Sequence, residues 1–238
     1  MAKQERAERT RSALLTAAAD VFDHVGYERA SLNAISEAAG VTKGALSFHF
    51  ATKADLARAV QSTACSSSRT ALTALDHTHP PTLQTVIDMT HVLAHLLEHH
   101  VVVRAGIRLS RELDHAPDAA YDCTVLWREL LEDVLRRAED DHGLAPGHDP
   151  RTLTALALTM ATGTELLVRT PPGPEAHCSV DGPRDTGRDW LAQFWQLVLP
   201  GVAAPGRLRP TGTLGPCRVP ASLYDLPRSP RDAVRSPE

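Results

Sequence analysis

The stretch SLNAISEAAGVTKGALSFHF, residues 31–50, predicts two short helices joined by a tight turn. Ser31 precedes the first helix and can accept a hydrogen bond from a free backbone N–H of its first turn. The chain must turn out of that helix at Gly40. We expect a positive φ there, which a residue without Cβ adopts without strain. Thr42 can cap the second helix. The apolar face of the first helix is formed by Leu32, Ile35, Ala38 and Ala39.

The second helix, from Lys43 to about His49, is held to its neighbours by Ala45, Leu46 and Phe50. Its other side is basic and rich in hydroxyl groups, which suits the major groove of DNA. Lys43 can reach a phosphate or a guanine edge, and Gly44 allows a close backbone approach to phosphate. The plain alternative is a helical hairpin whose outer face only meets water. The residues predicted to contact DNA are Thr42, Lys43, Gly44, Ser47, Phe48, His49 and Lys53.

With its surroundings, this stretch resembles the N-terminal domain of the TetR family of repressors. The resemblance rests on the basic lead-in RAERTRSALLTAAADVF, on the turn at Gly26–Tyr27, and on AISEAAGVTKGALSFHFATKADL. The last piece follows the family pattern VxxGxLYxHFxxKxxL. Its matching positions are Val41, Gly44, Leu46, His49, Phe50, Lys53 and Leu56.

Composition narrows the remaining choices. The chain has 238 residues and a net charge of −4, so it is not a uniformly basic nucleic-acid coat. Four widely spaced cysteines form no C-x-x-C pair and indicate reduced thiols in a cytoplasmic protein. We find no signal peptide, and no apolar run approaches the roughly 18 residues that span a bilayer. The common catalytic motifs are absent from the sequence, which argues against an enzyme; no cofactor is expected.

The rest of the chain predicts an all-α protein. A long helix starts at Lys53 and runs towards Leu75, and helices follow at about 82–100, 101–114, 118–142, 149–170 and 188–203. The resemblance to the TetR family then implies a helix–turn–helix DNA-binding domain at 1–52, with three helices, and a helical ligand-binding and dimerisation domain at 53–204. Residues 171–187 form a loop, and the Pro-rich tail at 205–238 is expected to be disordered.

Within the TetR family, the chain resembles the γ-butyrolactone autoregulator receptors of Streptomyces-like bacteria. This resemblance rests on three segments: the opening 27 residues, VVVRAGIRLS at 101–110 and LWREL at 126–130. The resemblance implies a homodimeric, cytoplasmic, nucleoid-associated repressor of antibiotic genes that leaves a pseudo-palindromic operator when a small lactone binds. It places Trp127 in the ligand pocket, with Thr159 and Thr162 as nearby hydroxyls. From the residues alone, Trp127 is equally well a core residue.

One departure and one rival reading remain open. Ser47 stands where the family usually has Tyr, so we expect either the operator or the affinity for it to differ from the family's. A row of histidines, His91, His95 and His99, lies on one side of a helix, and two His at this spacing can share a metal ion. A metal-sensing repressor, a repressor that answers to an antibiotic or other small molecule, and a helical protein that binds no DNA are the alternatives.

Overall fold

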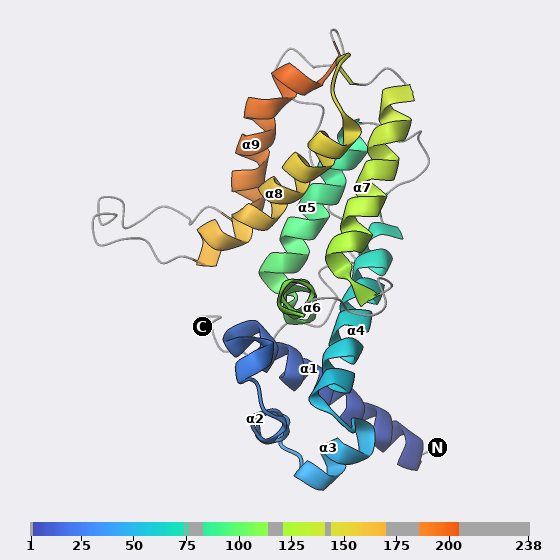
Figure 1. Ribbon diagram of the computed structural model, residues 1–238, viewed down its shortest axis with the longest axis vertical. Coiled ribbons are helices and arrows are strands. Elements are labelled where there is room, and N and C mark those ends of the chain that lie inside the picture. Colours follow the sequence, from blue (N-terminus) through green and yellow to red (C-terminus); the bar gives the residue numbers. More distant parts are fainter. Residues whose placement is uncertain are drawn as a thin grey trace, which may run out of the picture. The chain divides into compact units, whose positions relative to one another are not determined.

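The computed structural model describes residues 2–73, 75, 83–113, 121–140, 144–169 and 186–204. The described residues are helical apart from short connections and one isolated bridge between Leu144 and Ala203, which confirms the all-α prediction. Figure 1 shows the helices in chain order. None of the described helices is long and apolar enough to cross a membrane. Most of the predicted loop 171–187 and all of the tail 205–238 lie outside the described residues.

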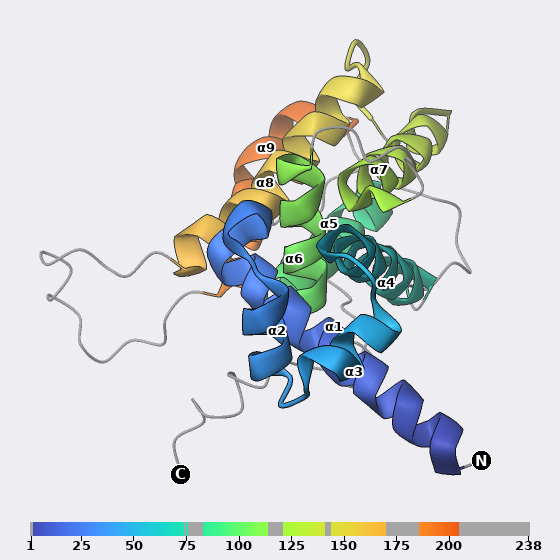
Figure 2. The same cartoon turned by 60° about the horizontal axis from the view of Figure 1, so that its bottom comes forward.

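The chain divides into two compact units, and the described part of the first comprises residues 2–70, 99–113 and 121–126. Its helices are α1 (Ala2–Arg29), α2 (Leu32–Ala38), α3 (Lys43–His49), most of α4 (Lys53–Thr73) and α6 (Val101–Glu112). This unit is larger than the predicted domain 1–52 because α1, which ends at Arg29, packs along α6, which begins only at Val101. Figure 2 shows α2 beside α1, and α3 next to α2.

An aliphatic core holds the first unit together. Leu46 of α3, Phe50 and Leu56 of α4 are at most 5% exposed, and they join apolar side chains of α1, α2 and α6 in one cluster. Gly26 interrupts α1 with a φ of +81°, a left-handed conformation that favours glycine. The predicted turn at Gly26–Tyr27 is therefore present as a kink. Val25, directly before the kink, is 39% exposed.

The described part of the second unit comprises residues 71–73, 75, 83–98, 127–140, 144–169 and 186–204. It contains α5 (Leu83–His99) up to Glu98, α7 (Cys123–Asp140) from Trp127 onward, α8 (Pro150–Arg169) and α9 (Gly187–Val202). α8 and α9 pack side by side (Figure 1). Pro150 is the first residue of α8, where its missing N–H costs no helical hydrogen bond. Thr186 and Asp189 form a capping box at the start of α9.

Candidate functional site

The two short helices of the predicted helix–turn–helix form as the sequence indicates. Ser31 Oγ accepts the Ala34 N–H at 3.1 Å, and Thr42 Oγ1 accepts the Ala45 N–H at 3.2 Å. Gly40 has a φ of +64°, so the turn between α2 and α3 uses the left-handed conformation expected there. These local interactions fix the residue at which α3 starts and the direction of α3 relative to α2.

One side of α3 is buried and the other is open. Leu46 is fully buried, whereas Thr42, Lys43, Gly44 and Ser47 are exposed. A Cβ added to Gly44 would meet nothing closer than Thr42 Oγ1, at 3.9 Å, so the helix surface at Gly44 is free for close approach. This face has the shape and donors that a recognition helix needs.

Phe48 is the most exposed large apolar side chain of this face. It is 83% exposed, and its ring lies edge-on to the ring of His49 with 5.3 Å between centroids. Exposure of a whole phenyl ring to water is unfavourable, so a partner that covers Phe48 would be stabilised by it. The methyl group of thymine is such a partner in the major groove.

Lys53, one of the residues predicted to contact DNA, makes several contacts within the protein. Its Nζ donates to the main-chain carbonyls of Tyr27 at 2.8 Å, Ala30 at 3.1 Å and Glu28 at 3.3 Å. The same ammonium lies 4.3 Å from the centre of the Tyr27 ring. A cation at this place satisfies carbonyls at the C-terminal end of α1 and suits the negative end of that helix. The structure thus directs Lys53 into the protein.

The start of α4 is fixed by a second capping box. Thr52 Oγ1 accepts the Asp55 N–H at 3.0 Å, and Asp55 Oδ2 accepts the Thr52 N–H at 3.1 Å. The hydrogen bonds from the Thr52 hydroxyl and from Arg58 hold the pKa of the Asp55 carboxyl below its ordinary value. Thr52 therefore caps α4, and this cap places the Lys53 side chain at the end of α1.

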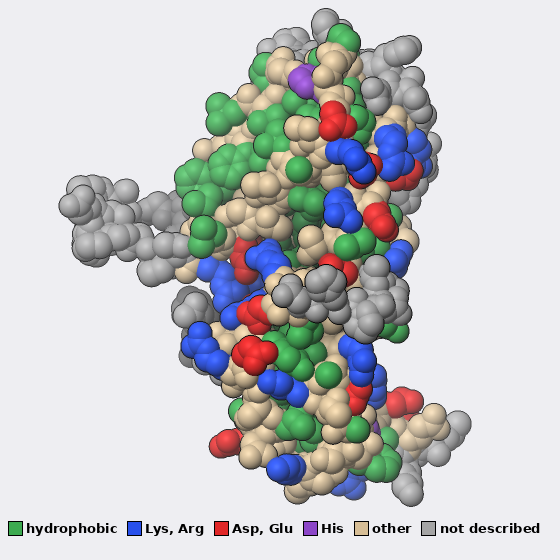
Figure 3. Space-filling model, in the orientation of Figure 1, with side chains coloured by type: hydrophobic (Ala, Val, Ile, Leu, Met, Phe, Trp, Pro, Cys, Tyr) green, Lys and Arg blue, Asp and Glu red, His purple; other side chains and the backbone are tan. Residues whose placement is uncertain are grey.

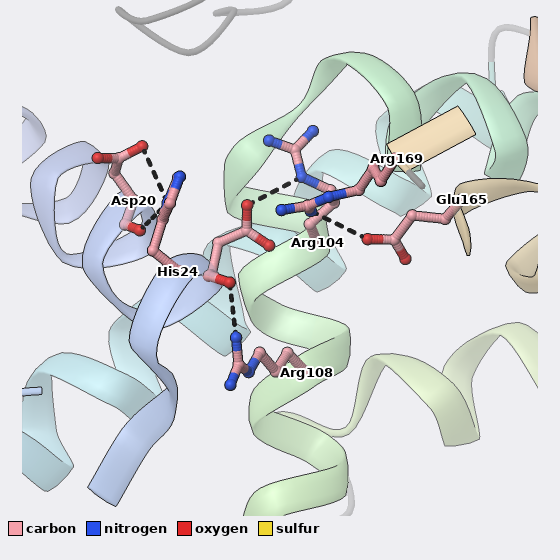
Figure 4. Close-up of polar contacts among 7 residues, drawn as sticks. Asp20, His24, Arg104, Arg108, Glu165 and Arg169 are labelled. Carbon is pink, nitrogen blue, oxygen red and sulfur yellow. Dashed lines mark hydrogen bonds and ion pairs between the residues drawn. The ribbon is translucent and has the colours of Figure 1, made fainter. Parts of the chain in front are cut away.

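Sequence reasoning missed the ionic contacts that join α6 to α1. Arg104 Nε donates to Asp23 Oδ2 at 3.1 Å, and Arg108 Nη1 donates to the Asp23 carbonyl at 2.6 Å. Figure 4 shows both arginines projecting from α6. Glu112 accepts the Tyr27 N–H at 2.6 Å. The spacing of Arg104, Arg108 and Glu112, four residues apart on one helix face, was the available signal.

Glu112 also marks the kink of α1. Burial disfavours the charged carboxylate, but hydrogen bonds from the Tyr27 N–H and from Arg108 outweigh burial and lower the pKa of Glu112. A Cβ at Gly26 would lie 2.8 Å from Glu112 Oε1 and 2.7 Å from Arg108 Nη2. The kink, its glycine and these two side chains of α6 thus depend on one another.

In the second unit, Trp127 is fully buried on α7. The predicted hydroxyl partners do not share that burial: Thr159 is exposed, and Thr162 is half-buried. Their hydroxyls donate to main-chain carbonyls one turn earlier in α8, those of Ala155 at 2.7 Å and Leu158 at 2.8 Å. The buried hydroxyls of α8 belong to Thr154 and Thr164, at 1% exposure each.

The histidine row does not form a metal site among the described residues. No group of three or more His, Cys, Asp or Glu side chains in the described ranges is arranged to hold a metal ion. His91 is 3% exposed, and its Nδ1 has no hydrogen-bond partner. Burial, and then the positive charge of Arg188, lower the pKa of His91 to about 4. His91 is thus a neutral, buried imidazole at ordinary pH.

The fold and the open face of α3 define a helix–turn–helix DNA-binding protein. Residues 14–60 match the family model "Bacterial regulatory proteins, tetR family". The chain is 32% identical over 217 residues to the A-factor receptor protein of Streptomyces griseus, covering 89% of this chain and 71% of the relative. The chain therefore belongs to the TetR family of bacterial regulatory proteins, in the branch of the γ-butyrolactone receptors, and is not an enzyme.

Solved structures agree with this assignment. A crystal structure of a γ-butyrolactone receptor, an ArpA-like protein, has a TM-score of 0.72 and 29% identity and covers 92% of this chain and 98% of its own. The TetR family protein CprB of Streptomyces coelicolor, in complex with its biological operator sequence, has a TM-score of 0.68 and 31% identity. That match covers 85% of this chain and 92% of CprB.

Proposed function

We propose that the chain is a ligand-responsive repressor that binds a pseudo-palindromic operator as a homodimer and leaves it when a small lactone binds. The observation that carries the proposal is the open face of α3, where Lys43, Gly44 and Ser47 are exposed while Leu46 anchors the helix in the core. The CprB complex with its operator supports DNA as the partner. The regulator would act in the cytoplasm, on the nucleoid, and its target genes would be those of antibiotic production.

In this proposal α3 lies in the major groove. Lys43 and Gly44 approach base edges and phosphates, and Phe48 covers a thymine methyl group. Thr42, Ser47 and His49 hold phosphates, which sets the position of the helix without reading sequence. Lys53 acts indirectly: it keeps the C-terminal end of α1 against the start of α4 and so positions the recognition helix.

Residues 1–52 carry the DNA contacts, and two copies are needed for a two-fold operator. The second unit offers a surface for pairing: Leu166 and Leu197 are 70% and 80% exposed, on α8 and α9 respectively. Figure 3 shows hydrophobic side chains gathered over these helices. Exposed apolar area of this kind is unusual on a monomer and is typical of an interface. Half-buried Trp190 and Phe194, whose ring centroids lie 6.2 Å apart, extend it.

The apolar side chains of α8 divide between core and surface. Leu153 and Met160 are each 8% exposed and belong to the interior of the second unit, whereas Leu156 is 37% exposed. We therefore assign the dimer contact to the exposed side of α8 and α9, where it would form a four-helix bundle with the partner copy.

The lactone would bind in the second unit. Trp127 supplies a flat apolar wall. Thr159 and Thr162 are poorly placed for a buried ligand because their hydroxyls bond to α8 itself. His91 Nδ1 is a better candidate for a polar contact, since it is buried and lacks a partner in the protein. The ligand acts only through its different affinities for the two forms of the regulator.

Fluorescence anisotropy on the pseudo-palindromic DNA upstream of the protein's own gene tests this function. We expect tight, salt-dependent binding that a γ-butyrolactone reverses. A zinc salt and an antibiotic extract, titrated in parallel, test the other signals. If only the zinc salt or only the antibiotic extract releases the DNA, the protein is still a repressor, but its ligand is not a lactone. Equal affinity for operator and scrambled DNA would remove the repressor function.

A further inference from the structure

Two buried cysteines of the first unit face each other. Cys65 lies in α4 and Cys123 is the first residue of α7, and their Sγ atoms are 2.8 Å apart. Cys65 is 5% exposed and Cys123 is fully buried, and both are free thiols. In a disulfide the sulfurs are about 2.05 Å apart, so the bond requires an approach of less than about 1 Å. We propose that a hydroperoxide converts this pair into a reversible disulfide that joins α4 to the start of α7.

The packing around the pair keeps the two thiols together. Cys123 Sγ also lies 3.6 Å from the main-chain carbonyl of Gln61 on α4. A Cβ at Gly106 of α6 would lie 2.4 Å from Ala64 Cβ and 3.5 Å from Cys123 Sγ, so α6 closes over the same place. Little room remains for either sulfur to rotate away. Sulfurs held in this way react with each other faster than with a second molecule.

The two thiols have unequal roles. The hydrogen bond from Cys123 favours the thiolate of Cys65, which lowers the pKa of Cys65, and the charge of Arg69 adds to this. The same contact and burial raise the pKa of Cys123. Because the thiolate is the nucleophile, and because Cys65 has the greater exposure, Cys65 is the sulfur that meets the oxidant.

The reaction balances in two steps. The Cys65 thiolate attacks one peroxide oxygen, the O–O bond breaks, and the leaving alkoxide takes the proton that Cys65 had released, leaving a sulfenic acid on Cys65. The Cys123 sulfur then attacks the Cys65 sulfur, the S–O bond breaks, and water departs with the Cys123 proton. The thiols together lose two electrons and two protons, and the hydroperoxide becomes an alcohol and water.

A polar side chain next to the pair supports entry of a small polar oxidant. Gln61 lies one turn before Cys65 on the same face of α4, is fully buried, and has no hydrogen-bond partner for either atom of its side-chain amide. A buried amide without partners is unfavourable. A hydroperoxide, which both donates and accepts hydrogen bonds, matches what this amide lacks.

The consequence for regulation rests on the proposed function. If lactone binding displaces α4 relative to the start of α7, the cross-link opposes that movement, and the oxidised repressor stays on its operator. Formation of the disulfide is a chemical event that can be measured without DNA or lactone. A failure of the redox proposal can therefore be distinguished from a failure of the proposed repressor function.

The experiment uses the full chain with Cys178→Ser and Cys217→Ser, which leaves only the proposed pair. The protein is treated with hydrogen peroxide, unfolded in N-ethylmaleimide and weighed by mass spectrometry. We expect both thiols to become resistant to alkylation, one peptide to link Cys65 with Cys123, and dithiothreitol to restore both thiols. In the same background, Cys123→Ser should stop at an alkylation-resistant or sulfenic Cys65 with no internal link.

Two alkylatable thiols after oxidation would overturn the proposal, and so would a disulfide found only between chains. The wild-type chain, oxidised and mapped in the same way, is the control for misfolding of the variants. In the operator assay, the oxidised form should need at least tenfold more lactone for half-release than the reduced form. An unchanged lactone response with the disulfide present would refute the regulatory consequence and leave the redox site standing.

Discussion

The guanidinium of Arg104 donates to the carboxylate of Asp23 at 3.1 Å, and these side chains are only 10% and 4% exposed. Removing one partner of a buried ion pair leaves the other charge uncompensated, which costs about 3 kcal/mol or more. We expect Arg104→Met to lower the free energy of unfolding by about that amount, measured by urea denaturation followed by circular dichroism. Arg104→Met together with Asp23→Leu should recover most of the loss.

A surface pair provides the control. Arg136 and Glu132 on α7 lie 3.0 Å apart, but the Arg136 side chain is 58% exposed. Arg136→Met should change the free energy of unfolding by less than about 0.5 kcal/mol, since water screens an exposed pair. Equal losses for Arg104→Met and Arg136→Met would contradict the role given to the buried pair.

Substitutions of Lys43 and Lys53 should distinguish a lysine that contacts DNA from one that only positions the recognition helix. Lys43 is exposed on α3, so Lys43→Ala should weaken operator binding at unchanged stability and reduce the slope of log affinity against log salt by about 0.9. Lys53 donates to three carbonyls at the end of α1, so Lys53→Gln should lower the melting temperature and weaken binding while the slope stays as in the wild type. Anisotropy at several salt concentrations measures both. A reduced salt slope for Lys53→Gln would instead show that Lys53 contacts a phosphate directly.

Local patterns in the sequence were sufficient to predict the helix–turn–helix. The caps at Ser31 and Thr42 and the positive φ of Gly40 depend on neighbouring residues only, and the structure contains each of them. Helical spacing likewise predicted where the later helices lie, to within a few residues.

Contacts between distant segments were not predictable in the same way. The Lys53 ammonium reaches carbonyls about 25 residues earlier in the chain, and nothing in its own surroundings indicates that. The α1 to α6 ion pair joins residues 81 positions apart. For α8, helical spacing predicts that one face is buried but not which one; the structure buries Thr154 and Thr164 and leaves Thr159 exposed.

Ser47 offers a gain-of-function test on α3. Its side chain is exposed and short, so it reaches less far than the tyrosine usual at this position. Ser47→Tyr adds a phenol that can donate to a phosphate, and we expect roughly fivefold tighter operator binding, equivalent to about 1 kcal/mol. Ser47→Phe separates the hydroxyl from the ring, because it adds the ring alone. If both variants bind alike, the gain comes from the ring and not from a phosphate hydrogen bond.

Phe48 should contribute to affinity and to base preference. Because its ring is 83% exposed in the free protein, Phe48→Ala removes no core packing and should leave the melting temperature unchanged. We expect roughly tenfold weaker operator binding, equivalent to about 1.4 kcal/mol. Replacing operator thymines by uracil, one at a time, removes a single methyl group. The wild type should be sensitive to one of these replacements and the Phe48→Ala variant should not; sensitivity retained in the variant would exclude the thymine contact.

His91 gives a test in the acidic range. Burial and Arg188 lower the pKa of His91 to about 4, whereas the same group in the unfolded chain titrates near its ordinary value of 6.5. Between these values the unfolded chain binds a proton that the folded chain does not, so stability falls as the pH falls from 6.5 towards 4. The difference corresponds to at most about 3.4 kcal/mol, at 1.36 kcal/mol per pKa unit. Urea denaturation at several pH values should show a shallower acid loss for His91→Gln than for the wild type. His24→Gln, on the exposed side of α1, is the control for removing a histidine, and an unchanged acid slope in His91→Gln would mean that other groups cause the loss.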